Sequence, residues 1–424
     1  MVGSKSKVKS FEIDKRLVHE AWMKVQANGG APGVDAVSIG GFREAERDNL
    51  YKLWNRMSSG SYLPGPVRAV EIPKDHGAGI RVLGVPNVAD RIAQTAAAML
   101  LEEKLEPIFH PDSYGYRPGR SAHDALAVTR RRCWKQDWVL DLDVRAFFDS
   151  VPHDLLLKAV AHHTDERWVL LYIKRWLTAP MQMPDGTLTA RDKGTPQGSP
   201  ISPLLANVFM HYAFDAWMVR EFPGCPFARY ADDIVAHCDS EDEARALRDS
   251  IATRLEALGL ELHPEKTKVV FCQDANPPGA AEHTSFDFLG YTFRGRQARG
   301  RHGYFVSFLP AISTQAKKAK GKQIRDWHLN RRTGTDLSGI AQAINPQVRG
   351  WINYYGVFYH SELFSLVRRI DEHLVRWAMH KYKRFRGKPG QAHTALTAVK
   401  RKEPTMFAHW QLVSITRRRS VGAV

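Results

Sequence analysis

The chain has 424 residues, 43% of them hydrophobic, which is enough for more than one domain with a buried core and excludes global disorder. Its formal net charge is +16, a balance that favours a polyanionic partner. Residues 291–424 hold 26 Lys and Arg against 6 Asp and Glu, whereas the rest of the chain is slightly acidic. This distribution predicts a basic binding region joined to a near-neutral body; an ordinary solvated basic surface is the alternative.

The cysteines and apolar segments argue against a zinc-binding, disulfide-rich, membrane-spanning or secreted protein. Cys133, Cys225, Cys238 and Cys272 lie far apart without a Cys-x-x-Cys pair, so we expect reduced thiols and neither a zinc site nor a disulfide framework. No apolar run reaches the length that crosses a membrane, and no apolar segment of a signal peptide follows the basic N-terminus. We therefore expect a cytoplasmic protein without a membrane partner.

The first part of the chain is predicted to mix helices and strands. Residues 11–57 indicate two helices around a Gly-rich turn, and the alternation within 67–85 indicates a β-hairpin. A helix is expected over 90–105, followed by a Gly- and Pro-rich loop at 111–120. The next helix is expected over 121–135, with Ser121 as its N-cap.

The middle of the chain alternates between the same two kinds of element. We expect, in order, a buried strand at 138–144, helices to 176, a hairpin around 185–186, a loop at 194–203, a helix to 220, a β-hairpin at 227–238, a helix at 241–258 and a strand at 286–293. This order predicts an α+β fold with helices packed on one face of a sheet. Beyond residue 309 the sequence becomes helical and basic.

Two pairs of aspartates lie at the ends of apolar strands. Asp141 and Asp143 close the segment WVLDLDV, and their spacing of two places both on one face of the strand. Asp232 and Asp233 lie at the tip of the hairpin FARYADDIVAHC. Carboxylates from separate strands can hold two hard cations such as Mg²⁺, which is what phosphoryl transfer requires. Each pair alone also fits ordinary turn or helix-cap chemistry.

Seven sequence blocks resemble the reverse-transcriptase family and follow that family's order. The resemblance covers roughly residues 65–291 and implies a right-hand polymerase, with fingers and a palm built on an antiparallel sheet, followed by an α-helical thumb. It also implies RNA-directed DNA polymerase activity, a nucleotidyl transfer. The blocks are EIPKDHGAGIRVLGVP, SYGYRPGRSAHDAL, VLDLDVRAFFDSV, GTPQGSPISPLLAN, RYADD, LELHPEKTKVV and FLGY.

Three details resemble the proteins encoded by bacterial group II introns: RPGRSAHDAL, the FFD after the first aspartates, and NPQVRGWINYYG, which is similar to that family's maturase (thumb) signature. We predict an N-terminal helical extension at 1–60, fingers and palm at 61–300, a thumb/maturase domain at 301–386 and a basic nucleic-acid-binding segment at 387–424. The Cys and His pairs of an HNH endonuclease are missing from this sequence. We therefore expect insertion without second-strand cleavage, or a role acquired after mobility was lost.

The resemblance assigns the catalytic residues position by position. Asp143 and Asp232 correspond to the ligands of two Mg²⁺ ions, and Asp233 is the neighbouring catalytic carboxylate. The backbone carbonyl of Val144 would complete one metal shell. Asp141 is then a structural residue or an additional nearby charge.

Five further residues are implied to contact the nucleotide. Phe148 matches the aromatic residue that excludes a 2′-hydroxyl, although plain core packing is the alternative. Lys74 and Arg81 would reach the triphosphate unless they are ordinary surface charges. Gln197 would approach the base pair in the minor groove, or simply belong to a turn, and Lys266 would protonate the leaving pyrophosphate.

Basic residues in the fingers and in the last third are predicted to contact nucleic acid. The expected partners are group II intron RNA, an RNA template with its DNA primer, deoxynucleoside triphosphates and target DNA. Aromatic residues at helical spacing, such as Trp351 and Tyr355, are expected to form the core of the thumb. The predicted contacts are Arg117, Arg120, Arg368, Arg369, Arg376, Lys381, Lys383, Arg384 and Arg386.

Three functions remain open at this point. The chain polymerises DNA on RNA and assists splicing of an intron, or it is a splicing maturase with a decayed polymerase site, or it is a domesticated reverse transcriptase in DNA repair or phage defence. The intact Asp143, Asp232 and Asp233 set argues against the second function. The sequence does not separate the first from the third.

Overall fold

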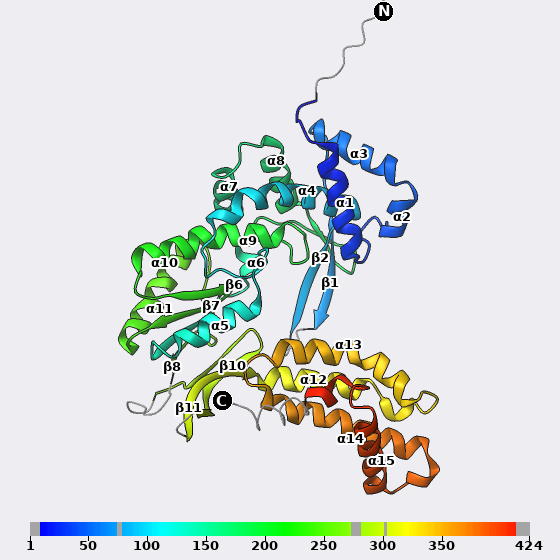
Figure 1. Ribbon diagram of the computed structural model, residues 1–424. Helices are drawn as coiled ribbons and strands as arrows, with labels where there is room; N and C mark the ends of the chain where they lie inside the picture. The colour runs from blue at the N-terminus through cyan, green and yellow to red at the C-terminus, as the bar shows by residue number, and fades with distance from the viewer. Residues whose placement is uncertain (1–8, 74–78, 273–280, 301–302, 413–424) are drawn as a thin grey trace, which may run out of the picture. The chain divides into compact units, whose positions relative to one another are not determined.

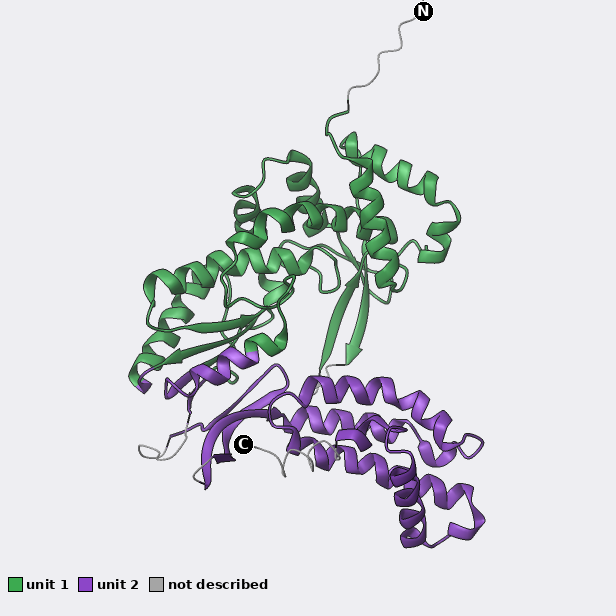
Figure 2. Cartoon of the chain, viewed as in Figure 1, with its two compact units in different colours: residues 1–125, 140–238, 242–267 green, residues 126–139, 239–241, 268–424 purple. Residues whose placement is uncertain are grey.

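The computed structural model describes residues 9–73, 79–272, 281–300 and 303–412. These residues form two compact units (Figure 2). Unit 1 comprises residues 1–125, 140–238 and 242–267, and unit 2 comprises residues 126–139, 239–241 and 268–424. The candidate catalytic residues all belong to unit 1, so its architecture determines the site.

Unit 1 begins with three helices, where the sequence predicted two. They are α1 (Lys15–Asn28), α2 (Ile39–Glu44) and α3 (Glu46–Ser58). The side chain of Ser38 accepts a hydrogen bond from Gly41 N and starts α2 inside what was predicted to be one longer segment. The turn after α1 is held by Arg91, whose guanidinium donates to the carbonyls of Gly29 and Ala31 at 3.1 and 2.9 Å.

The predicted β-hairpin at 67–85 is confirmed. Strands β1 (Val67–Pro73) and β2 (Ile80–Val85) pair antiparallel, with Arg68 opposite Val85. A short hairpin of β4 (Met181–Gln182) and β5 (Leu188–Thr189) adds to β1, which gives the strand order β2-β1-β4-β5. The predicted hairpin around residues 185–186 is thereby confirmed as well.

The bounds of the helices from α4 to α10 match the predictions closely. Ser121 and Asp124 cap α5 (Ala122–Arg132) reciprocally, since Asp124 N donates to the Ser121 hydroxyl and Ser121 N donates to the Asp124 carboxylate. The remaining helices are α4 (Val88–Leu105), α6 (Phe147–Ser150), α7 (His153–Ala161), α8 (Arg167–Thr178), α9 (Ser202–Met210) and α10 (Ala216–Glu221). A π-helical turn at His211–Asp215 joins α9 to α10.

The sheet that carries the aspartates has the strand order β6-β7-β3-β8. Its strands are β3 (Trp138–Asp143), β6 (Phe227–Tyr230), β7 (Asp233–Cys238) and β8 (Lys268–Phe271), and α9 and α10 run beside the β6–β7 hairpin (Figure 1). The predicted helix after β7 is α11 (Glu241–Glu256). β8, the last strand in this order, was not predicted from the sequence.

Residues 286–293 belong to a separate three-stranded sheet. It contains β9 (Ser285–Phe288), β10 (Tyr291–Gly300) and β11 (Gly303–Ile312) in the order β11-β10-β9. A turn at Leu289 and Gly290, with φ of +51° and +76°, separates β9 from β10. The alternation changes phase at this turn, because Phe286 and Phe288 are buried before it and Tyr291 and Phe293 after it, and the prediction of one strand overlooked that change.

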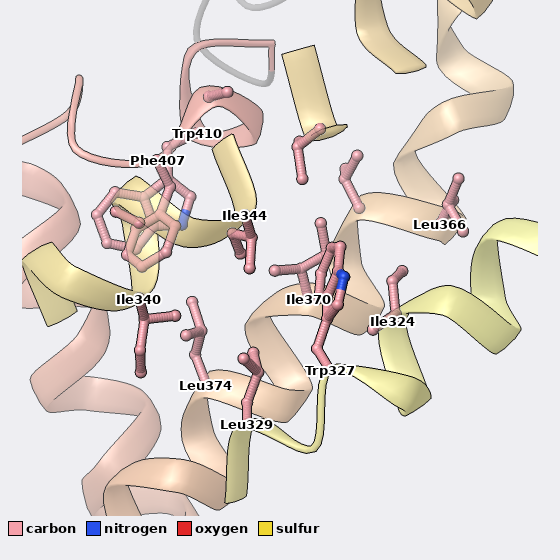
Figure 3. Packing of buried hydrophobic residues seen from close by; sticks show 14 of the residues in the cluster. Ile324, Trp327, Leu329, Ile340, Ile344, Leu366, Ile370, Leu374, Phe407 and Trp410 are labelled. Carbon is pink, nitrogen blue, oxygen red and sulfur yellow. The ribbon is translucent and has the colours of Figure 1, made fainter. Parts of the chain in front are cut away.

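The helical character predicted after residue 309 begins at Thr314. Unit 2 contains α12 (Thr314–Asp326), α13 (Leu337–Tyr355), α14 (Phe364–Lys381) and α15 (Pro389–Lys402). Figure 3 shows Ile340, Ile344, Ile370 and Leu374 converging on one buried cluster. Trp351 stacks on Trp327 with ring centroids 5.5 Å apart, so the aromatic residues do form the core of this region.

The buried cluster continues past the boundary predicted at residue 386. Leu396, Phe407 and Trp410 are all part of it. Asn345 fixes the last segment, because its amide donates to Met406 O at 2.8 Å and its oxygen accepts from Ala408 N at 2.9 Å. Residues 387–412 are therefore an integral layer of the helical unit and not a separate segment.

None of the described helices has the length and hydropathy that crossing a membrane would need. All four cysteines are buried, and none forms a disulfide, in line with the expected reduced thiols.

We expect Phe407→Ala to destabilise unit 2 by about 3–5 kcal/mol, since a fully buried aromatic side chain would leave a cavity. Thermal unfolding should show this as a lower Tm. Phe305→Ala is the matched control, because Phe305 is 53% exposed, and it should change the Tm little. Equal Tm values for both variants would contradict the inclusion of residues 387–412 in this core.

Candidate active site

The aspartates singled out from the sequence lie at the ends of neighbouring strands. Asp143 ends β3, and Asp233 begins β7, the strand next to β3 in the sheet. Asp141 and Asp143 are half-buried, while Leu140 and Leu142 next to them in the strand are buried, so both carboxylates face the same side as predicted. Asp232 lies in the turn that leads into β7.

This turn has an unusual backbone. Tyr230 pairs with Asp233, which leaves Ala231 and Asp232 as a two-residue hairpin loop. Ala231 has φ of +60°, a conformation that costs a residue with a Cβ roughly 1–2 kcal/mol. Gly115 lies directly against it, since a Cβ at Gly115 would be 2.5 Å from Ala231 N. The Ser-Tyr-Gly-Tyr block therefore supplies the one residue that lets the catalytic turn pack this closely.

A buried arginine holds the same turn from inside. Arg229 is fully buried, and its guanidinium forms two parallel hydrogen bonds to the carboxylate of Asp215, at 2.7 and 2.5 Å. Its remaining nitrogen donates to Asn207 Oδ1 and to Ala231 O, both at 3.0 Å. The Ala231 carbonyl is therefore fixed by a charged donor, which stabilises the left-handed conformation of that residue.

The partners of Arg229 come from the interrupted helix beside the sheet. Asp215 is the last residue of the π-helical turn, and Asn207 lies in α9. Asn207 also donates to Gly115 O at 2.7 Å, so one hydrogen-bond network connects the helix, Gly115 and the turn. A π-helical turn at this position agrees with the frequent use of such turns at functional sites.

Lys266 reaches Asp143 because two backbone segments are bonded together. Arg145 N donates to Glu261 O at 2.8 Å and His263 N donates to Asp143 O at 2.7 Å, on either side of a bridge between Val144 and Leu262. This contact delivers the Lys266 ammonium to Asp143 Oδ2 at 2.5 Å. A lysine and a strand-end aspartate that are far apart in sequence thus form one ion pair at the site.

Two of these carboxylates, those of Asp232 and Asp233, disfavour their charged forms. Asp233 is exposed at the start of β7, yet partial loss of surrounding water, followed by repulsion from Asp232 and Asp143, raises its pKa to about 7. Loss of water and the charge of Asp143 also raise the pKa of Asp232, while Arg81 and Lys266 oppose the rise. A group of oxygen donors with excess negative charge fits hard divalent cations, which would relieve this repulsion.

The loop at 194–198 docks onto two neighbouring segments. Thr195 N donates to Phe148 O at 2.7 Å, and Gly84 N donates to Gln197 O at 2.7 Å. Gly198 has φ of +110°, and a Cβ there would be 2.7 Å from Gly84 O, so the close approach requires glycine. Phe148 is half-buried with its ring edge on Phe147, which leaves part of the ring accessible. The structure thus places Phe148, in α6, beside the loop that contains Gln197.

The structure describes Arg81 and Val144, two further residues predicted to belong to the site. Arg81 is exposed on β2, and its charge acts on Asp232 and Tyr116, so it belongs to the same electrostatic site. Val144 is buried, as a residue that offers only its backbone would be. Lys74 lies outside the described residues.

Arg117 does not have the surroundings expected of a nucleic-acid contact. Its side chain is buried and bonds bidentately to the two carboxylate oxygens of Glu106 at 2.7 and 3.1 Å, and it also donates to the carbonyls of His110 and Ser113. These bonds give it a structural role in the loop at 111–120. Arg120, by contrast, is exposed.

The basic residues predicted to bind nucleic acid in unit 2 are mostly exposed. Lys381 is the exception: it is half-buried and donates to Thr335 O at 2.7 Å. The exposed residues are Arg368, Arg369, Arg376, Lys383, Arg384 and Arg386. Their contact with nucleic acid stays a prediction.

Sequence reasoning missed two groups of residues. Arg229 stands in an apolar strand directly before the Tyr-Ala-Asp-Asp turn, and a lone arginine there was the available signal. Cys225, Cys238 and Glu243 have ligand atoms within 4.8 Å of one another, although their spacing did not suggest a cluster.

Comparison with known proteins decides the family. A profile of the family described as reverse transcriptase (RNA-dependent DNA polymerase) matches residues 72–293, which contain all of the aspartates above. The chain belongs to the reverse transcriptase family. A second profile, of the group II intron maturase-specific domain, matches residues 317–394. This reverse transcriptase is thus an RNA-directed DNA polymerase of the group II intron type, as the sequence blocks predicted.

Individual relatives agree with this assignment. The reverse transcriptase is 32% identical to protein YkfC of Escherichia coli K12, over 66% of this chain and 80% of that one. It is 30% identical to the group II intron-encoded protein LtrA of Lactococcus lactis, over 46% of this chain but only 32% of LtrA. Telomerase from Candida albicans matches in structure with a TM-score of 0.47 and 13% identity, over 89% of this chain and 68% of that one. That score is too low to support an argument.

The buried pair can be tested by removing one partner. We expect Arg229→Met to lower the free energy of unfolding by about 3–5 kcal/mol, because the Asp215 carboxylate would stay buried without its cation. Arg220→Met is the matched control, since Arg220 pairs with Glu221 at 2.6 Å on the exposed surface and should cost less than about 1 kcal/mol. Urea unfolding of both variants measures the difference, and equal losses would refute the role of burial.

Proposed function

We propose that this reverse transcriptase extends a DNA primer on an RNA template at the Asp143, Asp232 and Asp233 site, and binds group II intron RNA to assist splicing and mobility. The observation that carries the polymerase part is the placement of these carboxylates at adjacent strand ends, with raised pKa values at Asp232 and Asp233. Repulsion of this kind is maintained where bound cations offset it.

Oxygen ligands at this site suit Mg²⁺. Asp143, Asp232 and the Val144 carbonyl would hold two ions, with Asp233 adding negative charge beside them. When bound, the ions would polarise the attacking 3′-hydroxyl and stabilise charge on the leaving pyrophosphate. The Lys266 ammonium lies 2.5 Å from Asp143 Oδ2, which makes Lys266 the candidate proton donor to the pyrophosphate oxygen.

The neighbouring side chains suit the binding of a nucleoside triphosphate. Arg81 is an exposed cation coupled to the aspartates, which favours contact with the triphosphate. The accessible part of the Phe148 ring would face the sugar, and Gln197 would lie beside the base pair. Both belong to the region that Thr195 and Gly198 fix against Phe148 and Gly84.

The helical unit supplies the proposed RNA-binding part. It contains the maturase-specific domain and the exposed cations from Arg368 to Arg386. Six such cations in one short stretch favour phosphate contacts with folded RNA and with the primer–template duplex. Target DNA would be recognised through the same chemistry. A role in DNA repair or phage defence would use the same polymerase site and stays open.

Asp143→Asn tests the polymerase proposal. We expect primer extension to fall about a thousandfold, because losing one ligand charge at this centre removes roughly 4 kcal/mol of transition-state stabilisation. Asp249→Asn changes an aspartate that is 69% exposed on α11 and should extend primers normally. RNA binding should be equal in both variants. Extension by the Asp143 variant at the rate of the control would refute this active site.

Phe148→Ala tests the position of the sugar. We expect incorporation of ribonucleotides to rise relative to deoxyribonucleotides, because the steric contact with a 2′-hydroxyl would be lost. Single-nucleotide incorporation with matched ribo- and deoxyribonucleoside triphosphates measures the ratio. Phe305→Ala, on β11, should leave the ratio unchanged. An active Phe148 variant with unaltered selectivity would return this residue to plain core packing.

A further inference from the structure

A cavity of about 760 Å³ lies in the helical unit, apart from the catalytic residues. One face of α14 forms its long wall, since the residues that line it recur at helical spacing from Phe364 to Met379. The start of α15 and His409 form the other sides. Its volume lies within the range of about 300–1,000 Å³ that is typical of ligand sites.

The cavity combines an apolar wall with cations. Val367, Val375 and Met379 supply apolar surface, of a kind on which a planar ring can pack. Arg368 and Arg376 lie about two helical turns apart on the same wall, and both are exposed. The cations would hold negative groups on either side of a ring that lies against the apolar wall.

Polar groups at the other side of the cavity are held in place. Asp371 accepts hydrogen bonds from His409 Nε2 and Trp410 Nε1, both at 2.8 Å, and Lys400 lies 3.5 Å from its second oxygen. His409 is 1% exposed, and among the described residues its Nδ1 has no hydrogen-bond partner. A buried polar atom without a protein partner costs free energy, so His409 leaves one unsatisfied nitrogen at this side of the cavity.

We propose that this cavity binds an unpaired nucleotide of an RNA strand, with its base against the apolar wall and its phosphates on Arg368 and Arg376. The occupant follows from charge, because the lining cations Arg368, Arg376 and Lys400 outnumber the lining carboxylates of Asp371 and Glu372, an excess that attracts phosphates. The proposal deepens the RNA-binding part of the proposed function and rests on it. Its chemistry is shared by single-stranded DNA, so the test includes both.

Gly390 allows the cavity to be filled without changing any charge. It lines the cavity at the start of α15, and a Cβ there would meet nothing within 4 Å. Gly390→Trp should therefore place an indole in the space proposed for the base. Gly334→Trp is the matched control, because Gly334 has equally open surroundings in the same unit and does not line the cavity. Gly390→Leu is a smaller second variant in case the tryptophan disturbs the fold.

Fluorescence anisotropy with labelled 12-nucleotide oligoadenylate, as RNA and as DNA, and with a blunt 12-base-pair RNA duplex tests the proposal. We expect Gly390→Trp and Gly390→Leu to bind single strands about tenfold more weakly, the value of one lost stacked base. Duplex binding, the salt dependence and the Tm should match those of Gly334→Trp. A larger loss of affinity for the RNA strand than for the DNA strand identifies RNA as the ligand of the cavity.

Unchanged single-strand affinity in both Gly390 variants, or an equal loss for strand and duplex, would overturn the cavity proposal and leave the polymerase intact. If the unaltered protein binds neither the strands nor the duplex, the RNA-binding part of the proposed function fails together with it.

Discussion

The arrangement of the proposed catalytic centre depends on one buried ion pair, Arg229 with Asp215. Arg229 cannot lose its charge, and an unpaired guanidinium in the interior would be very unfavourable, so Asp215 must stay opposite it. With that geometry set, the remaining donors point to Asn207 and to the Ala231 carbonyl. The turn that carries Asp232 is thereby fixed by the interior of the sheet and helices and needs no bound ligand to define it.

The same site combines several features that are unfavourable in free energy. Ala231 adopts a left-handed backbone, and the carboxylates around Asp233 repel one another. Such strain persists where the surrounding structure over-determines it, and here Gly115, Asn207 and Arg229 do so. Lys266 offsets part of the charge through Asp143. The protein therefore prepares a site of high negative charge on a rigid support, which is what binding of cations and triphosphate requires.

Much of this could be predicted from the sequence, because strand-end aspartates, hairpins and helical periodicity are local signals. The places where prediction failed depend on contacts remote in sequence. The turn at Leu289 and Gly290 was overlooked although the alternation changes phase there, and the short strand β8 was not predicted. Arg117 looked like a surface cation until Glu106 was found beside it. The core extends past residue 386 because Asn345 bonds to Met406, which no local pattern indicates.

The most direct measurement is single-turnover incorporation of one deoxynucleotide by the double variant Arg229→Met, Asp215→Leu. Replacing a buried ion pair by apolar side chains is often neutral for stability. The free energy of unfolding of this variant should therefore be close to that of the unaltered protein. We predict that incorporation nevertheless stays at least about tenfold slower, because the Ala231 carbonyl and Asn207 lose their charged donor. Incorporation at the unaltered rate by the stable double variant would contradict the claim that Arg229 positions the catalytic turn.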